Sequence, residues 1–257
     1  MEEIITSRRN PSVLRAVSLK LKKNRDSLGL FFAEGRVLLE EALASGVVPA
    51  RIFCVPDALP LIPAEADCPV TRVAPEVYEK LSVEDSPEGI MSVFSKPAPR
   101  VPEPGSKAVV LEEIRDPGNV GTVLRTAAAL GIGEVMLTGC ADVYSPKAVR
   151  ASMGAIFRLP VTETDSVASC AGILRKRGAR IAAAVVSPDA APLLRGAGLP
   201  WDAVMIGNEG HGLSREAREL CDGSVYIPMK GMESLNAAVA AALIMWEMSG
   251  GEDVRTR

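Results

Sequence analysis

The first half of the chain alternates short apolar runs with amphipathic stretches. Apolar residues at helical spacing predict helices over residues 12–21, 36–44 and 75–81, because positions three or four apart share one face of a helix. Short apolar segments bounded by turn residues predict strands. These segments are residues 30–33, 51–55, 70–73 and 89–94. The order predicts a compact α/β unit of roughly 95 residues, an ordinary size for a domain.

A proline-rich segment follows this unit. Residues 97–105 contain four prolines and end on a glycine. Proline has no N–H and a fixed φ, so the segment cannot form a helix or a central strand, and it is typical of a semi-stiff linker. We therefore divide the chain into an N-terminal domain (1–96), this linker, a second domain (106–250) and a short tail (251–257).

The second half again alternates strands with helices. Strands are predicted at residues 108–111, 134–137, 180–186, 203–206 and 225–227, and helices at residues 121–130, 146–155, 167–177, 214–220 and 237–246. This alternation indicates a mainly parallel sheet covered on both faces, with ligands beyond the carboxyl ends of its strands. The last helix is nearly all small and apolar. We expect it to be buried on most sides, with Ser234 as its N-cap.

Composition narrows the class of protein. Hydrophobic residues make up 47% of the chain and aromatic residues 4%, which favours α/β packing over an all-β sandwich. The five cysteines are scattered without a C-x-x-C pair, and His211 is the single histidine. We therefore expect no metal site and reduced thiols, as in the cytoplasm. No stretch has the length and apolarity of a membrane span, and the first residues lack a signal-peptide pattern.

Positive charge is concentrated near the N-terminus. Residues 1–25 hold seven lysines and arginines against two glutamates, a local charge of 7 − 2 = +5, although the whole chain carries −3. Such a segment is a candidate surface for RNA phosphates. The candidate contacts are Arg8, Arg9, Lys22, Lys23 and Arg25. The alternative is a solvated amphipathic helix, which charge runs commonly form.

Three polar, glycine-rich loops follow three of the predicted strands in the second half. They cover residues 112–121, 207–214 and 228–236. Glycines at 207, 210 and 212 permit close approach of the main chain to a ligand or positive φ angles. None of the loops is a dinucleotide fingerprint or a P-loop. A tight turn explains any one of them alone, but three polar loops at one edge of a sheet indicate a ligand site.

At these loops the sequence resembles the SpoU (TrmH-like) family of S-adenosylmethionine-dependent RNA methyltransferases of the SPOUT superfamily. The family's three motifs are similar to residues 119–127, 206–214 and 227–236, and its middle region to residues 150–155. The N-terminal unit resembles the L30e-like RNA substrate-binding domain often fused to this family, on residues 6–11 and 32–35. The segment between Met229 and Ser234 is slightly shorter than the family pattern.

The resemblance implies an α/β fold with a C-terminal trefoil knot, a homodimer, and methylation of a ribose 2′-hydroxyl in structured RNA. Ribosomal RNA of the 23S type is the first candidate substrate and transfer RNA the second. The implied contacts of the cofactor, S-adenosylmethionine, are Gly207, Asn208, Ile227, Met229 and Leu235. The implied catalytic group is Asn119, Arg125, Glu209, Ser234 and Asn236.

A ribose hydroxyl is a poor nucleophile and must lose its proton or be strongly polarised. Two roles for Arg125 stay open. It could be a general base whose pKa is depressed by its surroundings, or a cation that stabilises the developing alkoxide while another acceptor takes the proton. Asn119 and Glu209 would orient Arg125 or the hydroxyl. We interpret His211 as a loop residue. The alternative functions are a catalytically silent RNA-binding protein of the same fold, a small-molecule enzyme with a nucleotide-binding fold, and a base-methylating enzyme.

Overall fold

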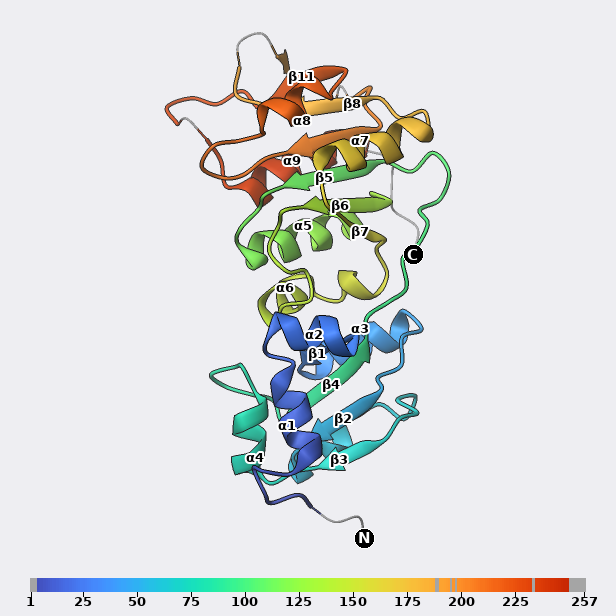
Figure 1. Ribbon diagram of the computed structural model, residues 1–257, viewed down its shortest axis with the longest axis vertical. Coiled ribbons are helices and arrows are strands. Elements are labelled where there is room, and N and C mark those ends of the chain that lie inside the picture. Colours follow the sequence, from blue (N-terminus) through green and yellow to red (C-terminus); the bar gives the residue numbers. More distant parts are fainter. Residues whose placement is uncertain (1–3, 188–189, 195, 197, 233, 250–257) are drawn as a thin grey trace. The chain divides into compact units, whose positions relative to one another are not determined.

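The computed structural model describes residues 4–187, 190–194, 196, 198–232 and 234–249 (Figure 1). It divides into two compact units. The N-terminal unit contains the chain up to Ala98 together with Asp142–Arg158, and the C-terminal unit contains Pro99–Ala141 and the chain from Leu159 onward. Residues 142–158 thus cluster with the N-terminal unit, although the linear division placed them in the second domain.

The N-terminal unit is built on a mixed four-stranded sheet with the order β1-β4-β2-β3. The strands are β1 (Leu30–Glu34), β2 (Arg51–Cys54), β3 (Val70–Arg72) and β4 (Ile90–Ser95). The helices are α1 (Pro11–Ser18), α2 (Lys22–Leu28), α3 (Arg36–Ala44), a 3₁₀ turn η1 (Pro56–Leu61) and α4 (Pro75–Leu81). The core includes an apolar cluster around Phe32, Phe53 and Tyr78 and another around Leu39 and Ile52.

Helix α2 was not predicted from the sequence. Its residues, KKNRDSL, have no apolar stripe, and Arg25 is the buried residue within it. The helix ends where Gly29 adopts a left-handed conformation with φ 64°. Hydrophobic periodicity cannot find a helix whose inward side chain is an arginine.

Arg25 is not an RNA contact, so that prediction is wrong. Its side chain is 3% exposed and forms an ion pair with Asp142. The same guanidinium donates to the carbonyl oxygens of Leu19 at 2.7 Å and Lys20 at 3.0 Å. Four of its five N–H donors are used inside the N-terminal unit and the side chain is buried, so Arg25 is not placed to contact a phosphate.

Residues 142–158 form a helical excursion that packs within the N-terminal unit. It contains α6 (Pro146–Ala151) and a 3₁₀ turn, η2 (Ala155–Phe157). Three ion pairs hold it, and they are Arg25–Asp142, Glu84–Arg150 and Glu41–Arg158. Tyr144 and Phe157 pack on Phe31, with ring centroids 5.0 and 6.0 Å away. The excursion is therefore held by both charge and aromatic packing.

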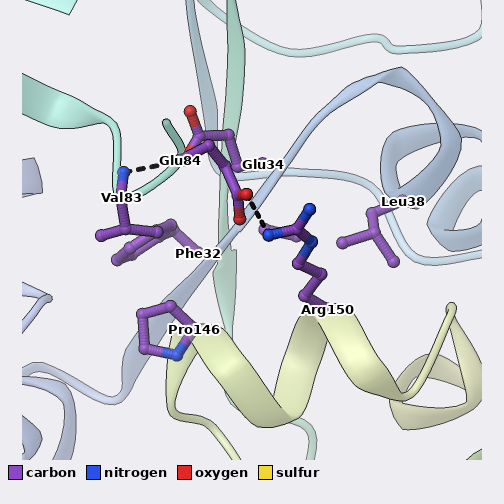
Figure 2. Close-up of a pocket in the computed structure, with 8 residues that line it drawn as sticks. Phe32, Glu34, Leu38, Val83, Glu84, Pro146 and Arg150 are labelled. Carbon is purple, nitrogen blue, oxygen red and sulfur yellow. Dashed lines mark hydrogen bonds and ion pairs between the residues drawn. The ribbon is translucent and has the colours of Figure 1, made fainter. Parts of the chain in front are cut away.

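One small cavity lies between the excursion and the rest of the N-terminal unit (Figure 2). Glu34 lines it and accepts a hydrogen bond from the main-chain N–H of Val83 at 3.1 Å, and Glu84 pairs with Arg150 beside it. The cavity volume is about 10 Å³. That is room for about one water molecule and excludes a nucleotide or cofactor.

The C-terminal unit contains a seven-stranded sheet in which every pairing is parallel, with the order β7-β6-β5-β10-β8-β11-β9. The strands are β5 (Ala108–Glu112), β6 (Glu134–Thr138), β7 (Val161–Thr164), β8 (Ile181–Ala184), β9 (Ala191–Pro192), β10 (Ala203–Ile206) and β11 (Gly223–Tyr226). The helices are α5 (Pro117–Ala129), α7 (Val167–Lys176), α8 (Arg215–Glu219) and α9 (Ala237–Met248). The predicted α/β class, the parallel C-terminal sheet and the smaller N-terminal domain with its own sheet are confirmed.

Helices cover both faces of this sheet (Figure 1). The apolar cluster on one face joins Met205 of β10 to Leu174 of α7 and Ala217 of α8. Successive strand residues point to opposite faces, so Val204 and Ile206 face the other side, where α9 packs against β10 and α5. The order of the strands brings the carboxyl ends of β5, β10, β8 and β11 to one edge.

The starts of two helices differ from the prediction. Helix α5 begins at Pro117, a turn earlier than predicted, because Asp116 accepts a hydrogen bond from the N–H of Gly118 at 2.6 Å. Helix α9 begins after Asn236, whose Oδ1 accepts from the N–H groups of Ala238 and Val239. Asn236, not Ser234, is therefore the N-cap.

Helix α9 is also less buried than predicted. Val239, Leu243 and Trp246 are 49%, 43% and 57% exposed, whereas Ala241, Ile244 and Met245 are buried. The exposed residues are spaced four and three apart, which places them on one face of the helix. The C-terminal unit therefore presents an apolar stripe along α9. No helix in the described part of the chain is long and apolar enough to cross a membrane.

Candidate active site

A cavity of about 760 Å³ lies at the carboxyl ends of β8, β10 and β11. The loop after β10, the loop after β11 and the start of α9 form most of its wall. The wall contains all five residues predicted to contact a cofactor, which are Gly207, Asn208, Ile227, Met229 and Leu235. Glu209 and Ser234 of the predicted catalytic group line it as well.

Gly207 is required by the packing of the loop itself. A Cβ at this position would lie 2.2 Å from main-chain atoms of Gly212 and Leu213. The loop folds back so that the N–H of Gly212 donates to the carbonyl oxygen of Asn208 at 2.9 Å. The approach that requires a glycine here is that of the main chain to itself.

The side chain of Asn208 holds this loop in place. Its Nδ2 donates to the carbonyl oxygen of Glu113 at 2.8 Å, and its Oδ1 accepts from the N–H of Gly210 at 2.8 Å. Both ends of the amide are therefore engaged within the protein. Asn208 borders the cavity as a residue that positions the loop.

Two residues that sequence reasoning did not single out support the same loop. Glu112 is 7% exposed and accepts from the N–H of Ser214 at 2.8 Å, so it holds the end of the loop opposite Asn208. Glu113 has φ 56°, a left-handed conformation that non-glycine residues seldom adopt. The sequence signal that could have identified Glu112 and Glu113 is a pair of acidic residues at the end of a buried strand.

His211 forms a surface cluster with Glu113 and Arg115. The Nε2 atom of His211 lies 3.4 Å from Glu113 Oε2, and Arg115 Nη2 lies 3.2 Å from the same oxygen. His211 and Arg115 are 64% and 66% exposed, so solvent screens these pairs and each contributes little to stability. This agrees with the interpretation of His211 as a loop residue.

Three members of the predicted catalytic group form one hydrogen-bonded chain. Asn236 Nδ2 donates to Asn119 Oδ1 at 3.2 Å, and Asn119 Nδ2 donates to Glu209 Oε1 at 2.7 Å. The three residues lie 117 and 90 positions apart in the sequence and come from the start of α9, the first turn of α5 and the loop after β10. Their meeting requires the folded sheet edge.

Arg125 stands apart from this chain. Its side chain is exposed on α5 and has no ion pair or side-chain hydrogen bond within the described part of the protein. It lies six positions after Asn119, about 240° around the helix axis, so the two side chains leave α5 in different directions. The structure thus joins Asn119, Glu209 and Asn236 and leaves Arg125 available to a further group.

The predicted RNA contacts other than Arg25 are exposed on the N-terminal unit. Arg8 pairs with Glu79 at 3.0 Å and Lys22 pairs with Asp26 at 2.8 Å. Arg9 and Lys23 form no ion pair among the described residues. Among the same residues, no group of three His, Cys, Asp or Glu side chains could hold a metal ion.

Comparisons with known proteins cover nearly the whole chain. The model of the SpoU rRNA Methylase family matches residues 106–246, and that of the MRM3-like substrate binding domain matches residues 10–92. The 23S rRNA (guanosine(2553)-2′-O)-methyltransferase RlmP of Bacillus subtilis is 29% identical, over 96% of this chain and 99% of its own length. An uncharacterized tRNA/rRNA methyltransferase of Synechocystis sp. is 34% identical, over 95% and 92%. The AdoMet-bound rRNA methyltransferase from Sinorhizobium meliloti is similar in structure, with a TM-score of 0.83, 27% identity and coverage of 96% and 97%.

Proposed function

The chain belongs to the SpoU rRNA Methylase family, and from this membership we propose that it transfers a methyl group from S-adenosylmethionine to a ribose 2′-hydroxyl of ribosomal RNA. The observation that carries the proposal is the cavity at the edge of the parallel sheet, with the chain of Asn236, Asn119 and Glu209 at its border. RNA of the 23S type is the first candidate, since RlmP is similar over its whole length. Transfer RNA is the second.

The cavity fits S-adenosylmethionine in size and chemistry. Its volume of about 760 Å³ falls within the range of about 300–1,000 Å³ of small-molecule sites. Ile227, Leu235 and Ile244 supply apolar surface for an adenine ring. The glycine-rich loop after β10 supplies main-chain N–H and C=O groups for the polar edges of the ligand.

The residues that line the cavity would bind the cofactor and position the substrate. When bound, S-adenosylmethionine supplies an electrophilic methyl group on a positively charged sulfur. Ile227, Met229 and Leu235 would hold the adenosine, and Gly207 and Asn208 would fix the loop against it. Ser234, exposed at the cavity, would contact the substrate. Methyl transfer needs an aligned nucleophile more than covalent help, so positioning supplies much of the rate.

The surroundings of Arg125 support the cationic role. An arginine is effectively always protonated in proteins, and Arg125 is exposed, so nothing around it in the described structure removes it from water. Arg125 would stabilise the developing alkoxide or an RNA phosphate by charge. A different group must then accept the proton.

A homodimer is part of the proposal. The stripe of Val239, Leu243 and Trp246 supports it, because contiguous exposed apolar surface commonly marks an interface. A second copy of the chain would cover this stripe. Sedimentation of the Trp246→Lys variant tests it: a monomeric variant against a dimeric wild type supports the interface, and an unchanged dimer contradicts it.

The N-terminal unit would bind the RNA. This role is supported by the match to the MRM3-like substrate binding domain and by Arg9 and Lys23, which form no ion pair with a described residue. The five cysteines are free, which is typical of a reducing compartment, so we also propose that the enzyme works in the cytoplasm. The knot stays a prediction from the family resemblance.

Calorimetric titration with S-adenosylmethionine and S-adenosylhomocysteine tests the cofactor site. We expect the wild type to bind both ligands and the Leu235→Arg variant to bind neither, because the guanidinium would enter the apolar wall. Leu59→Arg, on the surface of η1, is the matched control. Transfer of a labelled methyl group to ribosomal RNA, followed by mass mapping, tests the reaction. RNA binding without methyl transfer would instead support the silent RNA-binding protein.

A further inference from the structure

The start of α9 fixes the orientation of the Asn236 amide. The N–H groups of Ala238 and Val239 both point at one atom of this side chain, at 2.9 and 3.3 Å. An N–H can donate only to an acceptor, so that atom is the oxygen, Oδ1. The amide nitrogen of Asn236 must therefore face away from the helix, and it faces Asn119.

The orientation of the Asn236 amide in turn fixes the orientation of the Asn119 amide. Asn236 Nδ2 donates, so the atom of Asn119 that receives it at 3.2 Å is Oδ1. The Nδ2 atom of Asn119 is then directed at Glu209, where it donates to Oε1 at 2.7 Å. A helix N-terminus thus imposes one direction on both amides, and the chain ends on a carboxylate.

We propose that Glu209 is the catalytic residue that accepts the proton of the ribose 2′-hydroxyl, through its Oε2 atom. The Oε1 atom already accepts the hydrogen bond from Asn119, so Oε2 is the oxygen of Glu209 that is left open to a substrate proton. No donor among the described residues hydrogen-bonds to Oε2, and Glu209 lines the cavity. The inference rests on the proposed function and deepens it, because it names the acceptor that a cationic Arg125 requires.

The step balances in atoms and charge. The O–H bond of the 2′-hydroxyl breaks, and its proton forms a bond to Oε2 of Glu209. The electron pair left on the oxygen forms the new bond to the methyl carbon. The bond from that carbon to the sulfonium sulfur breaks, and its electrons stay on sulfur as a neutral thioether. One negative carboxylate and one positive sulfonium become two neutral groups.

Other acceptors at the cavity are less suited. Asp222 accepts from the N–H of Ile181, the first residue of β8, so it belongs to the amino-terminal edge of the sheet, away from the loops. Glu113 is engaged by Arg115 and His211. His211 is the remaining competitor, because one ring nitrogen can accept a proton.

The Glu209→Gln variant tests the proposal. Glutamine keeps the shape and can still accept from Asn119, but it cannot take a proton. We expect its single-turnover rate to fall by at least about 100-fold, the lower range for general base catalysis, while S-adenosylmethionine binds within about twofold of the wild type. Glu216→Gln, an exposed acid on α8, is the control and should keep the wild-type rate.

The pH profile separates catalysis from a structural role. A carboxylate that acts as the base predicts a wild-type rate that declines at acid pH, and the residual rate of Glu209→Gln should lack this decline. Besides Arg125, the charged groups beside the loop and the cavity are Glu112, Glu113, Arg115, His211, Arg218 and Asp222. Histidine is the side chain in this group that most commonly accepts a proton near neutral pH, so His211→Asn is measured in parallel and should keep the acid decline.

The outcomes distinguish the two levels of the proposal. A Glu209→Gln variant with the wild-type rate and profile would overturn the role of Glu209 and leave the methyltransferase intact. Loss of the acid decline in His211→Asn alone would also overturn it and assign the proton to His211. A wild type that binds no S-adenosylmethionine and methylates no RNA would reject the proposed function itself.

Discussion

Asn236 caps α9 with its side-chain oxygen and donates its side-chain nitrogen to Asn119 at 3.2 Å. One amide therefore serves two purposes, the start of a helix in the core and the orientation of a polar chain that ends on Glu209. The local stability of α9 and the geometry of the candidate site are linked through this side chain. The two purposes can be separated by substitution.

Asn236→Asp should keep the cap and break the chain of hydrogen bonds. Aspartate caps helices as well as asparagine, so the free energy of unfolding should change little, but its carboxylate cannot donate to Asn119. Asn236→Ala removes both functions and should cost about 1 kcal/mol of stability. Urea unfolding and single-turnover methylation measure the two effects. Equal rates for Asn236→Asp and the wild type would contradict the coupling.

Gly207→Ala should weaken cofactor binding by at least tenfold. Its Cβ would lie 2.2 Å from main-chain atoms of Gly212 and Leu213, which side-chain rotation cannot relieve. The loop must open, and the wall of the cavity moves with it. Gly210→Ala is the matched comparison, because its Cβ would lie 3.4 Å from Asn208 Oδ1, and we expect a smaller loss. Calorimetric titration measures both, and similar losses would count against the steric argument.

Arg25→Met should destabilise the protein strongly. Arg25 and Asp142 are 3% and 9% exposed at their side chains, and removal of one partner of a buried pair costs about 3–5 kcal/mol because the other charge is left uncompensated. The Arg25→Met/Asp142→Leu double variant should recover much of the loss. Arg158→Ala, in a pair that is 52% and 35% exposed, should cost less than about 1 kcal/mol. Unfolding in urea measures the free energy of unfolding of each variant. A double variant whose loss equals the sum of the two single losses would argue against coupling between Arg25 and Asp142.

The Arg9→Gln/Lys23→Gln double variant should bind RNA more weakly and with a smaller salt dependence. Each phosphate contact removed should reduce the slope of log K against log salt by roughly 0.7–0.9. Lys22→Gln should have a smaller effect, because its ammonium already pairs with Asp26 at 2.8 Å. Filter binding over a range of salt concentrations checks this. An unchanged slope in the double variant would place the RNA on another surface.

Asp26 should make stability depend on pH in the acid range. Hydrogen bonds from Lys22 and Lys96 lower the pKa of Asp26 to about 2, below its value in an unfolded chain. Because the folded pKa is depressed, the stabilisation is complete above about pH 4 and is lost as pH falls toward 2. In urea unfolding, the free energy of unfolding of the wild type should therefore exceed that of Asp26→Asn at about pH 6, and this difference should shrink as the pH falls to about 3. The effect is small because the side chain is 45% exposed, and a pH-independent difference would refute it.

Local signals in the sequence were sufficient for most of the elements. Strand β10 was predicted over its observed residues, α3 and α4 likewise, and Ser214 is the N-cap of α8 as predicted. Each of these has its cause within a few neighbouring residues: an apolar run, a proline at the first turn, a capping hydroxyl. The residues lining the cavity were placed by family motifs rather than by periodicity.

Features that depend on distant partners could not be predicted. Ser234 and Asn236 are both good capping residues, and Asn236 is the cap in a structure where its amide also bonds to Asn119, 117 positions away. Arg25 reads as a free cation in the sequence because its partner, Asp142, is equally far along the chain. The order of the strands, with β10 between β5 and β8, follows from no local pattern either.

The excursion of residues 142–158 affects how the N-terminal unit can be exchanged by recombination. The chain passes from one unit to the other after Ala98, after Ala141 and after Arg158, so the N-terminal unit is encoded by two separate stretches of the gene. A recombination event that exchanged only the first stretch would separate Glu41 from Arg158 and Glu84 from Arg150. Exchange of the first stretch alone would therefore replace one partner in each of these two ion pairs, so the two stretches are coupled within the N-terminal unit.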